Sequence, residues 1–251
     1  MYESTPMSSP NQTKGRLIRK NISISNYIAR AAQTLSLSEK RILMAGIAKL
    51  EGVNKEVKLS AHEYAETYGV NIHTAYDQLK AAAHSLMKRT LSWQISDGKK
   101  IGTRHTIWVQ GYDYFKDQGI VKFKFSEYIF PFLFELQQQF TQYKLKQAAS
   151  LRSIYSWRLL EMFEQMRQSI DNHKKSDGWL AITIEEFWHA MEATESYKKN
   201  FSLLRKWVIE PAVKELTEKD GWLIEWEARK KGRKVTSLFF KFTRNPQNGL
   251  F

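Results

Sequence analysis

Two short segments of the 251-residue chain, SAHEYAE at residues 60–66 and TIEEFWHA at residues 183–190, begin in the same way. In both, a hydroxyl residue stands three positions before a glutamate: Ser60 and Glu63 in the first, Thr183 and Glu186 in the second. This is the spacing of a capping box, in which the hydroxyl accepts from the glutamate backbone N–H and the glutamate carboxylate accepts from the N–H of the cap. Each segment therefore predicts the start of a helix.

The chain that follows each segment is similar too. A short turn, a second helical pattern and two alternating runs that predict a β-hairpin occur once over residues 60–109 and again over residues 183–242. Two helices joined by a tight turn and followed by a hairpin make a winged helix-turn-helix module. The predicted fold is therefore α+β, with two tandem winged-helix domains joined by a helical linker.

Composition and periodicity predict where the domains begin and end. Residues 1–21 are polar and end in a basic run, which predicts a disordered tail. Residues 22–140 are the predicted N-terminal winged-helix domain, and residues 141–251 the C-terminal one. The aromatic stretch 127–169 is expected to be helical and to contain the joint between them.

The elements of the first domain follow from the same patterns. Apolar spacing over residues 27–50 predicts two helices, with Ser36 or Ser38 as the cap between them. Further helices are expected at residues 59–68 and 74–88, around the turn Gly69-Val70-Asn71. Strands are expected at residues 91–95, 106–110 and 120–125.

The second domain is predicted to open with a short strand at residues 179–182. Its second helix is expected at about residues 202–217 and its hairpin strands at residues 222–228 and 235–242. Pro211 lies inside that helix, where it removes a backbone donor and clashes with the previous turn. We therefore expect a kink there.

The composition favours a polyanionic partner. Thirty-nine Lys and Arg against 26 Asp and Glu give a net charge of +13, and the pI is about 9.7. The absence of cysteine excludes disulfides, thiol catalysis and cysteine-based zinc sites. No apolar run approaches the roughly 20 residues of a membrane-spanning helix. We expect a cytoplasmic protein with no membrane partner.

Positive charge is concentrated near the end of the chain. Residues 151–195 hold five basic and eight acidic side chains, whereas residues 196–244 hold 13 and six. The excess coincides with the second helix and hairpin of the second domain, and in helix-turn-helix proteins the start of such a helix faces base edges in the major groove. The candidates for DNA contact there are Lys198, Lys199, Asn200, Ser202, Arg205 and Lys206.

The phase of this helix separates a core side from an outer side. Leu204, Val208 and Ala212 recur every four residues and are expected to face the core. That leaves the other side to Ser202, Arg205, Lys206 and Ile209. The Arg205 guanidinium can hold guanine O6 and N7 with two donors. A solvated basic face without a partner is the alternative.

Five charges in six residues stand at the tip of the second hairpin: Arg229, Lys230, Lys231, Arg233 and Lys234. Such a tip can straddle a phosphate backbone or enter the minor groove, and the release of counterions would make binding strongly salt-dependent. The alternative is a hairpin that its lysines keep soluble.

The second helix of the first domain is less basic. Its polar candidates for DNA contact are Asn71, His73, Thr74, Gln78 and Lys80, and those of the first hairpin are Lys99, Lys100 and Arg104. The hairpin residues suit phosphate. For the helix, which also holds three consecutive alanines and Tyr76 as an expected exposed aromatic, a subunit interface is equally consistent with the sequence.

Motifs for catalysis, cofactors or metals are missing from the sequence. The six histidines include no His-x-His or His-Glu-x-x-His pair, and neither glycine-rich nucleotide-binding motif is present. A tyrosine nuclease that nicks DNA would need a histidine pair to hold its metal. We therefore predict no enzymatic activity, no cofactor and no bound metal.

Several segments, in this order and spacing, resemble the initiator replication proteins of iteron-bearing theta plasmids, the group that includes the F-plasmid initiator. They cover about residues 22–244 and are LSLSEKR at 35–41, PFL at 131–133, FTQY at 140–143, SWRLLE at 156–161, Ser196-Tyr197, LRKWVIEPAVKEL at 204–216, KKGR at 230–233 and FKF at 240–242.

The resemblance implies two winged-helix domains that bind one DNA repeat, or iteron, when the protein is monomeric. It implies that the C-terminal domain reads bases, with Arg205 and Lys206 as the base-reading pair. The N-terminal domain would bind the other end of the repeat or mediate dimerisation. Dimers would repress the protein's own promoter, and monomers would start replication and recruit host replication proteins and chaperones.

The sequence thus predicts a plasmid replication initiator that binds double-stranded DNA, located in the cytoplasm of a bacterium with its plasmid or nucleoid. A transcriptional repressor built from the same two modules is the alternative among binding proteins. A nicking-type replication enzyme and an RNA-binding protein are the alternatives from other classes.

Overall fold

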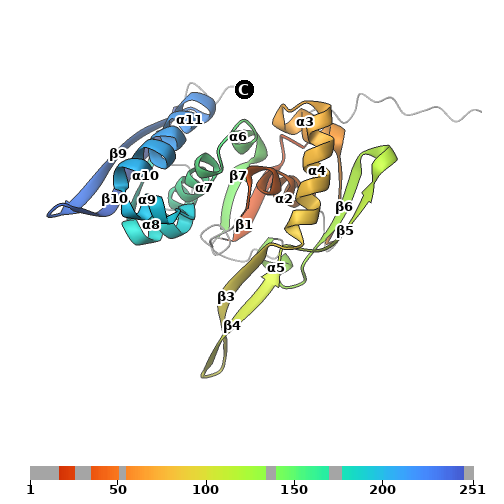
Figure 1. Cartoon of the computed structure of the whole chain (residues 1–251), viewed down its shortest axis with the longest axis horizontal. Helices are drawn as coiled ribbons and strands as arrows, with labels where there is room; N and C mark the ends of the chain where they lie inside the picture. Colours follow the sequence, from red (N-terminus) through yellow and green to blue (C-terminus); the bar gives the residue numbers. More distant parts are fainter. Residues whose placement is uncertain (1–16, 26–34, 51–54, 134–139, 170–176, 246–251) are drawn as a thin grey trace, which may run out of the picture.

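The protein, seen here as a computed structural model, consists of two α+β bodies that lie side by side (Figure 1). Each body has a hairpin that projects away from it, β3–β4 in the first and β9–β10 in the second. The structure describes residues 17–25, 35–50, 55–133, 140–169 and 177–245. Within these ranges, the helices are all too short or too polar to span a bilayer.

Three helices with well-defined starts build the first body: α2 (Leu37–Lys49), α3 (Ala61–Tyr68) and α4 (Ile72–Leu86). The predicted capping box of α3 is confirmed, because Glu63 N donates to Ser60 Oγ at 3.2 Å and Ser60 N donates to Glu63 Oε2 at 2.9 Å. Ser36, not Ser38, caps α2 and forms the same arrangement with Glu39. Gly69 ends α3 with a left-handed φ of 58°, which glycine adopts without strain. The helix predicted before Ser36 lies outside the described residues.

The strands of the first body form two separate sheets. β3 (Thr90–Asp97) and β4 (Lys100–Ile107) pair as a hairpin, while β2 (Glu56–Ser60), β6 (Ile120–Phe125) and β5 (Val109–Phe115) form a three-stranded sheet in that order. The predicted strand at residues 106–110 was therefore wrong, since its two halves belong to different sheets. Trp108, fully buried, marks the change of sheet: its N–H donates to Arg89 O and its carbonyl accepts from Ser126 N.

The stretch 127–169 is not helical throughout, contrary to the prediction. It holds the short helix α5 (Phe130–Leu133), strand β7 (Phe140–Lys144), α6 (Leu145–Ala149) and the long helix α7 (Ile154–Ser169). In β7, Thr141 and Tyr143 are buried while Gln142 and Lys144 are exposed. This alternation of burial has the period of a strand, but the residue types Phe-Thr-Gln-Tyr-Lys do not alternate between apolar and polar, so the sequence did not show it.

Strand β7 pairs antiparallel with β1 (Asn21–Ser25), near the start of the chain. Residues 17–21, predicted to belong to a disordered tail, are instead folded, since Leu17 is buried and Lys20 O accepts from Leu145 N at 2.9 Å. The domain boundary that we predicted at residues 140/141 stays a prediction, although this pairing joins residues 141–144 to the first body.

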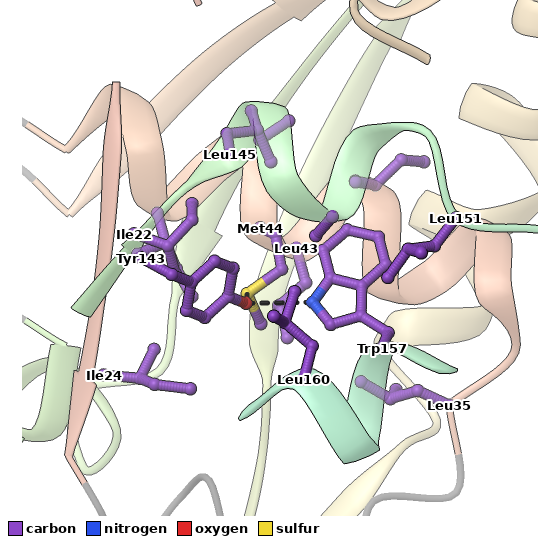
Figure 2. Close-up of a cluster of buried hydrophobic side chains, with 14 of the residues drawn as sticks. Ile22, Ile24, Leu35, Leu43, Met44, Tyr143, Leu145, Leu151, Trp157 and Leu160 are labelled. Atoms are coloured by element: carbon purple, nitrogen blue, oxygen red, sulfur yellow. Dashed lines mark hydrogen bonds between the residues drawn. The ribbon is translucent and has the colours of Figure 1, made fainter. Parts of the chain in front are cut away.

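A buried cluster packs β1 and β7 against α2 and α7 (Figure 2). At its centre, Trp157 Nε1 donates to Tyr143 Oη at 2.9 Å, and Tyr143 Oη donates to Glu161 Oε1 at 2.8 Å. Burial, together with the nearby Glu161 charge, raises the pKa of Tyr143 well above its ordinary value. The hydroxyl therefore stays protonated and remains a donor inside the core.

The second body consists of a three-stranded antiparallel sheet covered by helices. The sheet has the order β8 (Asp177–Thr183), β10 (Lys234–Arg244), β9 (Trp222–Lys231). The helices are α8 (Ile184–Met191), α9 (Glu195–Lys199), α10 (Phe201–Leu204), the π-helical turn η3 (Arg205–Ile209) and α11 (Glu210–Asp220). The predicted strands and hairpin are confirmed, and the hairpin strands extend further than predicted. Phe163 of α7 stacks on Phe242 with ring centroids 4.2 Å apart, which joins α7 to this sheet.

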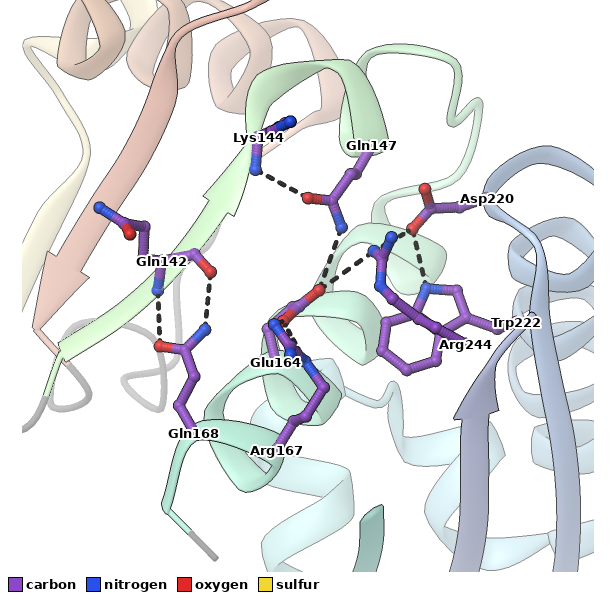
Figure 3. Close-up of polar contacts among 9 residues, drawn as sticks. All are labelled: Gln142, Lys144, Gln147, Glu164, Arg167, Gln168, Asp220, Trp222 and Arg244. Atoms are coloured by element: carbon purple, nitrogen blue, oxygen red, sulfur yellow. Dashed lines mark hydrogen bonds and ion pairs between the residues drawn. The ribbon is translucent and has the colours of Figure 1, made fainter. Parts of the chain in front are cut away.

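A polar network around Glu164 connects α7 to both bodies (Figure 3). The Glu164 carboxylate accepts from Gln147 Nε2 of α6 at 3.0 Å and from Arg244 Nη2 of β10 at 3.1 Å. Arg244 Nη2 also lies 3.0 Å from Asp220 Oδ2, which accepts from Trp222 Nε1 at 2.8 Å. Helix α7 therefore belongs to the packing of both bodies, which fixes their relative placement.

Candidate nucleic-acid interface

The turn that leads from α8 toward the basic end of the second body has a strained residue. Glu192 has a φ of 48°, the only positive φ of a non-glycine residue among those described. Its carboxylate accepts from Arg158 Nη2 of α7 at 2.9 Å. The predicted capping box at the start of α8 is confirmed, with Glu186 N donating to Thr183 Oγ1 at 3.2 Å. Arg158 of α7 thus contacts the turn from which the following helices start.

Residues 201–220 form one continuous helix made of α10, η3 and α11, which we call the basic helix. Leu204, Val208 and Ala212 are buried, as the sequence predicted. Ile209, predicted on the outer side, is buried as well. The reason is the π-helical turn at residues 205–209: its extra residue per turn rotates Ile209 toward the core.

Pro211 lies directly after the π-helical turn. Proline has no backbone N–H, so the α-helical hydrogen bond that residue 211 would donate is missing. In the structure, Glu210 N donates to Arg205 O, five residues back, and α11 starts with Pro211 in its first turn. The kink expected at Pro211 stays a prediction; the structure has a π-helical turn before the proline, within a helix that continues to Asp220.

The outer side of the basic helix presents the predicted pair of cations. Arg205 and Lys206 are exposed, and Ser202 lies one turn before them, also exposed. Arg205 Nε donates to Glu210 Oε1 at 2.6 Å, and its guanidinium carbon lies 5.8 Å from the ring centre of Trp226. Lys206 Nζ lies 5.1 Å from the ring centre of Trp207.

Trp207 and Glu210 were not among the candidates from the sequence. Trp207 is 55% exposed on the basic helix, which is unusual for tryptophan. Trp207 is out of phase with the buried Leu204 and Val208, and this phase could have predicted that its side chain is exposed. The hydrogen bond between Glu210 and Arg205 depends on the π-helical turn, and a regular helical phase does not predict it.

The loop before the basic helix holds the other candidates. The side-chain oxygen of Asn200 caps α10, accepting from Ser202 N at 3.0 Å and Leu203 N at 3.4 Å. Lys198 Nζ pairs with Glu195 at 2.8 Å, and both side chains are exposed. Lys199 is exposed. The hydrogen bond from Lys198, together with the charges of Lys198 and Lys199, lowers the pKa of Glu195. Asn200 therefore has a structural role that limits its availability for DNA.

The hairpin β9–β10 projects beyond the body (Figure 1). Its tip carries a cluster of exposed cations. Gly232 turns the chain with a φ of 63°. Arg229 pairs with Glu227 at 2.9 Å and lies 4.5 Å from the ring centre of Phe239. The other four cations form no side-chain hydrogen bond, ion pair or ring contact with any described residue: Lys230, Lys231, Arg233 and Lys234. We call these four residues the wing cations.

In the first body, the candidates on α4 are only partly available. Asn71 caps the helix, accepting from His73 N at 2.9 Å, and Gln78 accepts from the buried Tyr64 hydroxyl at 2.8 Å. His73, Thr74 and Lys80 are exposed. Tyr76, expected to be exposed, is half-buried. It packs so tightly on Gly119 that a Cβ there would lie 2.1 Å from the Tyr76 ring.

The first hairpin offers cations at its tip. Lys99 and Lys100 are exposed at the turn of β3–β4, and Ile101 beside them is 78% exposed. Arg104 is half-buried, with its guanidinium carbon 4.4 Å from the ring centre of Tyr128. The tip of this hairpin is therefore free to contact another molecule, whereas Arg104 is held against the body.

No three His, Asp or Glu side chains come together at a possible metal site within the ranges that the structure describes. Five of the six histidines lie in those ranges, and all five are exposed: His62, His73, His84, His105 and His189.

Comparisons with known proteins agree on the architecture. A family model described as "Initiator Replication protein, WH1" matches residues 21–164, and one described as "Initiator Rep protein, WH2" matches residues 183–242. An Escherichia coli protein described as an uncharacterized 27.6 kDa protein is 24% identical over 247 residues, which cover 92% of this chain and 99% of that one.

The crystal structure of Pi initiator protein in complex with iteron DNA has the same fold. It superimposes with a TM-score of 0.74 at 22% identity, over 91% of this chain and 99% of that chain. Together with the family models, this confirms the predicted α+β fold with two tandem winged-helix domains.

Proposed function

The chain belongs to the family of initiator replication proteins, with both of its winged-helix domains, and from this we propose that it starts plasmid replication by binding iterons in double-stranded DNA. The observation that carries the proposal is the group of cations on the basic helix and the adjacent hairpin of the second body. A solved structure of the same fold, Pi initiator protein, holds iteron DNA, which supports this choice of partner.

In the proposed complex, the start of the basic helix enters the major groove. Arg205 and Lys206 contact base edges, and Ser202 and Lys199 contact bases or phosphates. Lys198 must give up its ion pair with Glu195 to contact DNA. Asn200 caps the first turn of the basic helix and so orients it. Arg205 has its terminal nitrogens available, because its hydrogen bond to Glu210 uses Nε.

The wing cations contact the phosphate backbone next to the groove. Their four charges have no side-chain partner among the described residues, so binding DNA breaks no ion pair there. Arg229 stands at the base of this group. Because each phosphate contact releases counterions, the wing contributes affinity without sequence preference.

The first domain contributes a second contact, either to the same DNA or to another copy of the chain. Its candidates are Lys99 and Lys100 at the hairpin tip, with Arg104 behind them, and the α4 residues Asn71, His73, Thr74, Gln78 and Lys80. In this proposal monomers initiate replication and recruit host replication proteins and chaperones, and dimers repress the protein's own promoter. The protein acts without enzymatic activity, on a plasmid in the bacterial cytoplasm.

Footprinting on the DNA that flanks its own gene, with the complexes separated by size, tests this function. Protection of regularly spaced direct repeats by monomers is the expected result. Protection of only an inverted repeat over a promoter would instead identify a repressor. Metal-dependent cleavage of a supercoiled origin would identify a nicking enzyme, and preference for structured RNA over duplex DNA in competition would identify an RNA-binding protein.

A further inference from the structure

The π-helical turn in the basic helix changes which side chains are neighbours. In a regular α-helix, residues five apart point in directions roughly 140° apart, because each residue turns the chain by about 100°. In a π-helical turn, the hydrogen bond runs between residues five apart, so these residues lie one above the other. Arg205 and Glu210 are five apart, and Glu210 N donates to Arg205 O.

The side chains of the two residues meet as a result. Arg205 Nε donates to Glu210 Oε1 at 2.6 Å, with 59% of the Arg205 side chain and 46% of the Glu210 side chain exposed. The guanidinium also lies 5.8 Å from the Trp226 ring, which stacks on the buried Phe240. Glu210 and Trp226 therefore limit the rotation of the guanidinium from two sides.

The choice of nitrogen matters for DNA. A guanidinium has five N–H donors, of which Nε–H is one and the two terminal nitrogens provide four. Among the described residues, Glu210 is the only hydrogen-bond partner of this guanidinium, and it takes Nε–H. The terminal nitrogens thus remain for guanine O6 and N7.

We propose that Glu210 is a positioning residue that determines sequence specificity: it holds the Arg205 guanidinium so that both terminal nitrogens face one guanine in the major groove. The inference rests on the proposed function, since it requires Arg205 to read a base. The proposal includes Pro211: its ring crowds the previous turn and its N–H is missing, and we infer that both favour the π-helical turn that brings Glu210 next to Arg205.

If Glu210 acted only through its charge, the effect of neutralising it would be the opposite of the effect expected from a positioning role. Glu210 is an acidic residue next to a DNA-binding surface, so its neutralisation raises the affinity for any duplex. If its only effect were to mask Arg205, neutralisation would raise specific affinity at least as much as non-specific affinity. A positioning role instead lowers the ratio of specific to non-specific affinity.

The test uses the full chain and the duplex that it selects from a randomised pool, with a scrambled duplex as the non-specific probe. Glu210→Gln is compared with Glu218→Gln, which removes the same charge from the same helix. Glu218 is exposed and contacts Lys214 at 3.8 Å, away from Arg205. We expect Glu210→Gln to lower the ratio of specific to non-specific affinity by about tenfold, and Glu218→Gln to leave it unchanged.

A modified base makes the test specific for the Arg205 contact. Deazaguanine, which has carbon in place of N7, is placed at each guanine of the selected duplex in turn. At the guanine that Arg205 reads, we expect wild type to lose about tenfold in affinity and Glu210→Gln to lose much less. Pro211→Ala restores the missing N–H, and we expect it to lower the ratio in the same way although Glu210 is still present.

The results separate failure of this inference from failure of the proposed function. An unchanged or higher ratio in Glu210→Gln, with Arg205→Ala still losing specificity, would overturn the positioning role alone. An unchanged ratio in Pro211→Ala would overturn the part assigned to the π-helical turn. If wild type selected no sequence, or if Arg205→Ala kept the full ratio, base reading by the basic helix would fail and the positioning role with it.

Discussion

Lys40 on α2 and Glu161 on α7 form an ion pair in the core, with Nζ 3.0 Å from Oε2 and 2% of each side chain exposed. Burial lowers the pKa of Lys40 from its ordinary value, and the adjacent Glu161 carboxylate opposes that shift. The second Glu161 oxygen accepts from Tyr143 Oη at 2.8 Å. The pair thus links two helices that are 121 residues apart at the contact.

Removing only one charge of the Lys40–Glu161 pair should destabilise the fold more than removing both. Lys40→Met leaves the Glu161 charge buried without its cation, and we expect it to lower the free energy of unfolding by about 3–5 kcal/mol. Lys40→Met combined with Glu161→Gln removes both charges and keeps an acceptor for Tyr143. Urea unfolding should show the double variant to be more stable than the single one. A double variant less stable than the single one would contradict this account.

Base reading by Arg205 should appear as a loss of specificity. We expect Arg205→Ala to weaken binding to the selected DNA by about 1–3 kcal/mol while largely sparing binding to random duplex. The reason is that two hydrogen bonds to one guanine are lost while most phosphate contacts remain. Titrations of both duplexes at the same salt concentration measure this. An equal loss on random DNA would show that Arg205 contacts only phosphate.

The wing cations should contribute affinity to every duplex. Replacing Lys230 and Lys231 by Ala is expected to weaken binding to specific and random DNA alike, and to reduce the slope of log K against log salt by about two units. Each lysine lost means about one counterion fewer released. Lys214→Ala with Lys219→Ala, on the C-terminal part of the basic helix, is a control with the same change in charge. An unchanged slope for the wing variant would place the hairpin outside the interface.

Asp220 should make stability depend on pH. Burial, opposed by Arg244, raises the pKa of Asp220 to about 6. The folded state therefore holds this proton more tightly than the unfolded state, so the contribution to stability is full below pH 4 and is lost as the pH rises through 6. Asp220→Asn keeps an acceptor for Trp222 Nε1 and removes the titration.

We expect Asp220→Asn to gain stability relative to wild type as the pH rises from about 4 to 7, by about 2–3 kcal/mol. Urea unfolding of both proteins across this pH range measures the difference in stability. The other carboxylates titrate in both proteins, so their effect cancels in this difference. A constant difference between the two proteins would mean that Asp220 has an ordinary pKa in the folded state.

Local sequence was sufficient wherever a structure depends on residues a few positions apart. The capping boxes at Ser60 and Thr183 involve only a hydroxyl and a glutamate three residues later, and both were predicted and are present. The same holds for the buried phase of Leu204 and Val208 and for the second hairpin. The repeated pattern of these local elements was enough to predict two winged helices.

Contacts between distant residues were decided only by the tertiary structure. Strand β7 forms because β1, more than 100 residues earlier, supplies its hydrogen-bond partners, and the run at residues 106–110 divides because Trp108 is anchored between two sheets. Lys40 is a surface residue by type, and only the approach of α7 gives it Glu161 as a buried partner. Strand pairing and ion pairing of this kind depend on which distant segments pack against each other. The local sequence pattern does not contain that information.

The candidate site shows the same division. The sequence alone identified the cations of the basic helix and the wing, because charge and helical phase are local properties. How far each is available depends on its contacts in the folded chain. Asn200 caps its own helix, a local contact. Gln78 is bound to Tyr64 of the preceding helix and Arg104 is held over Tyr128, and these two contacts require packing between separate elements. The contact between Arg205 and Glu210 lies within one helix, but it depends on the π-helical turn, which the regular helical phase used for the prediction does not include.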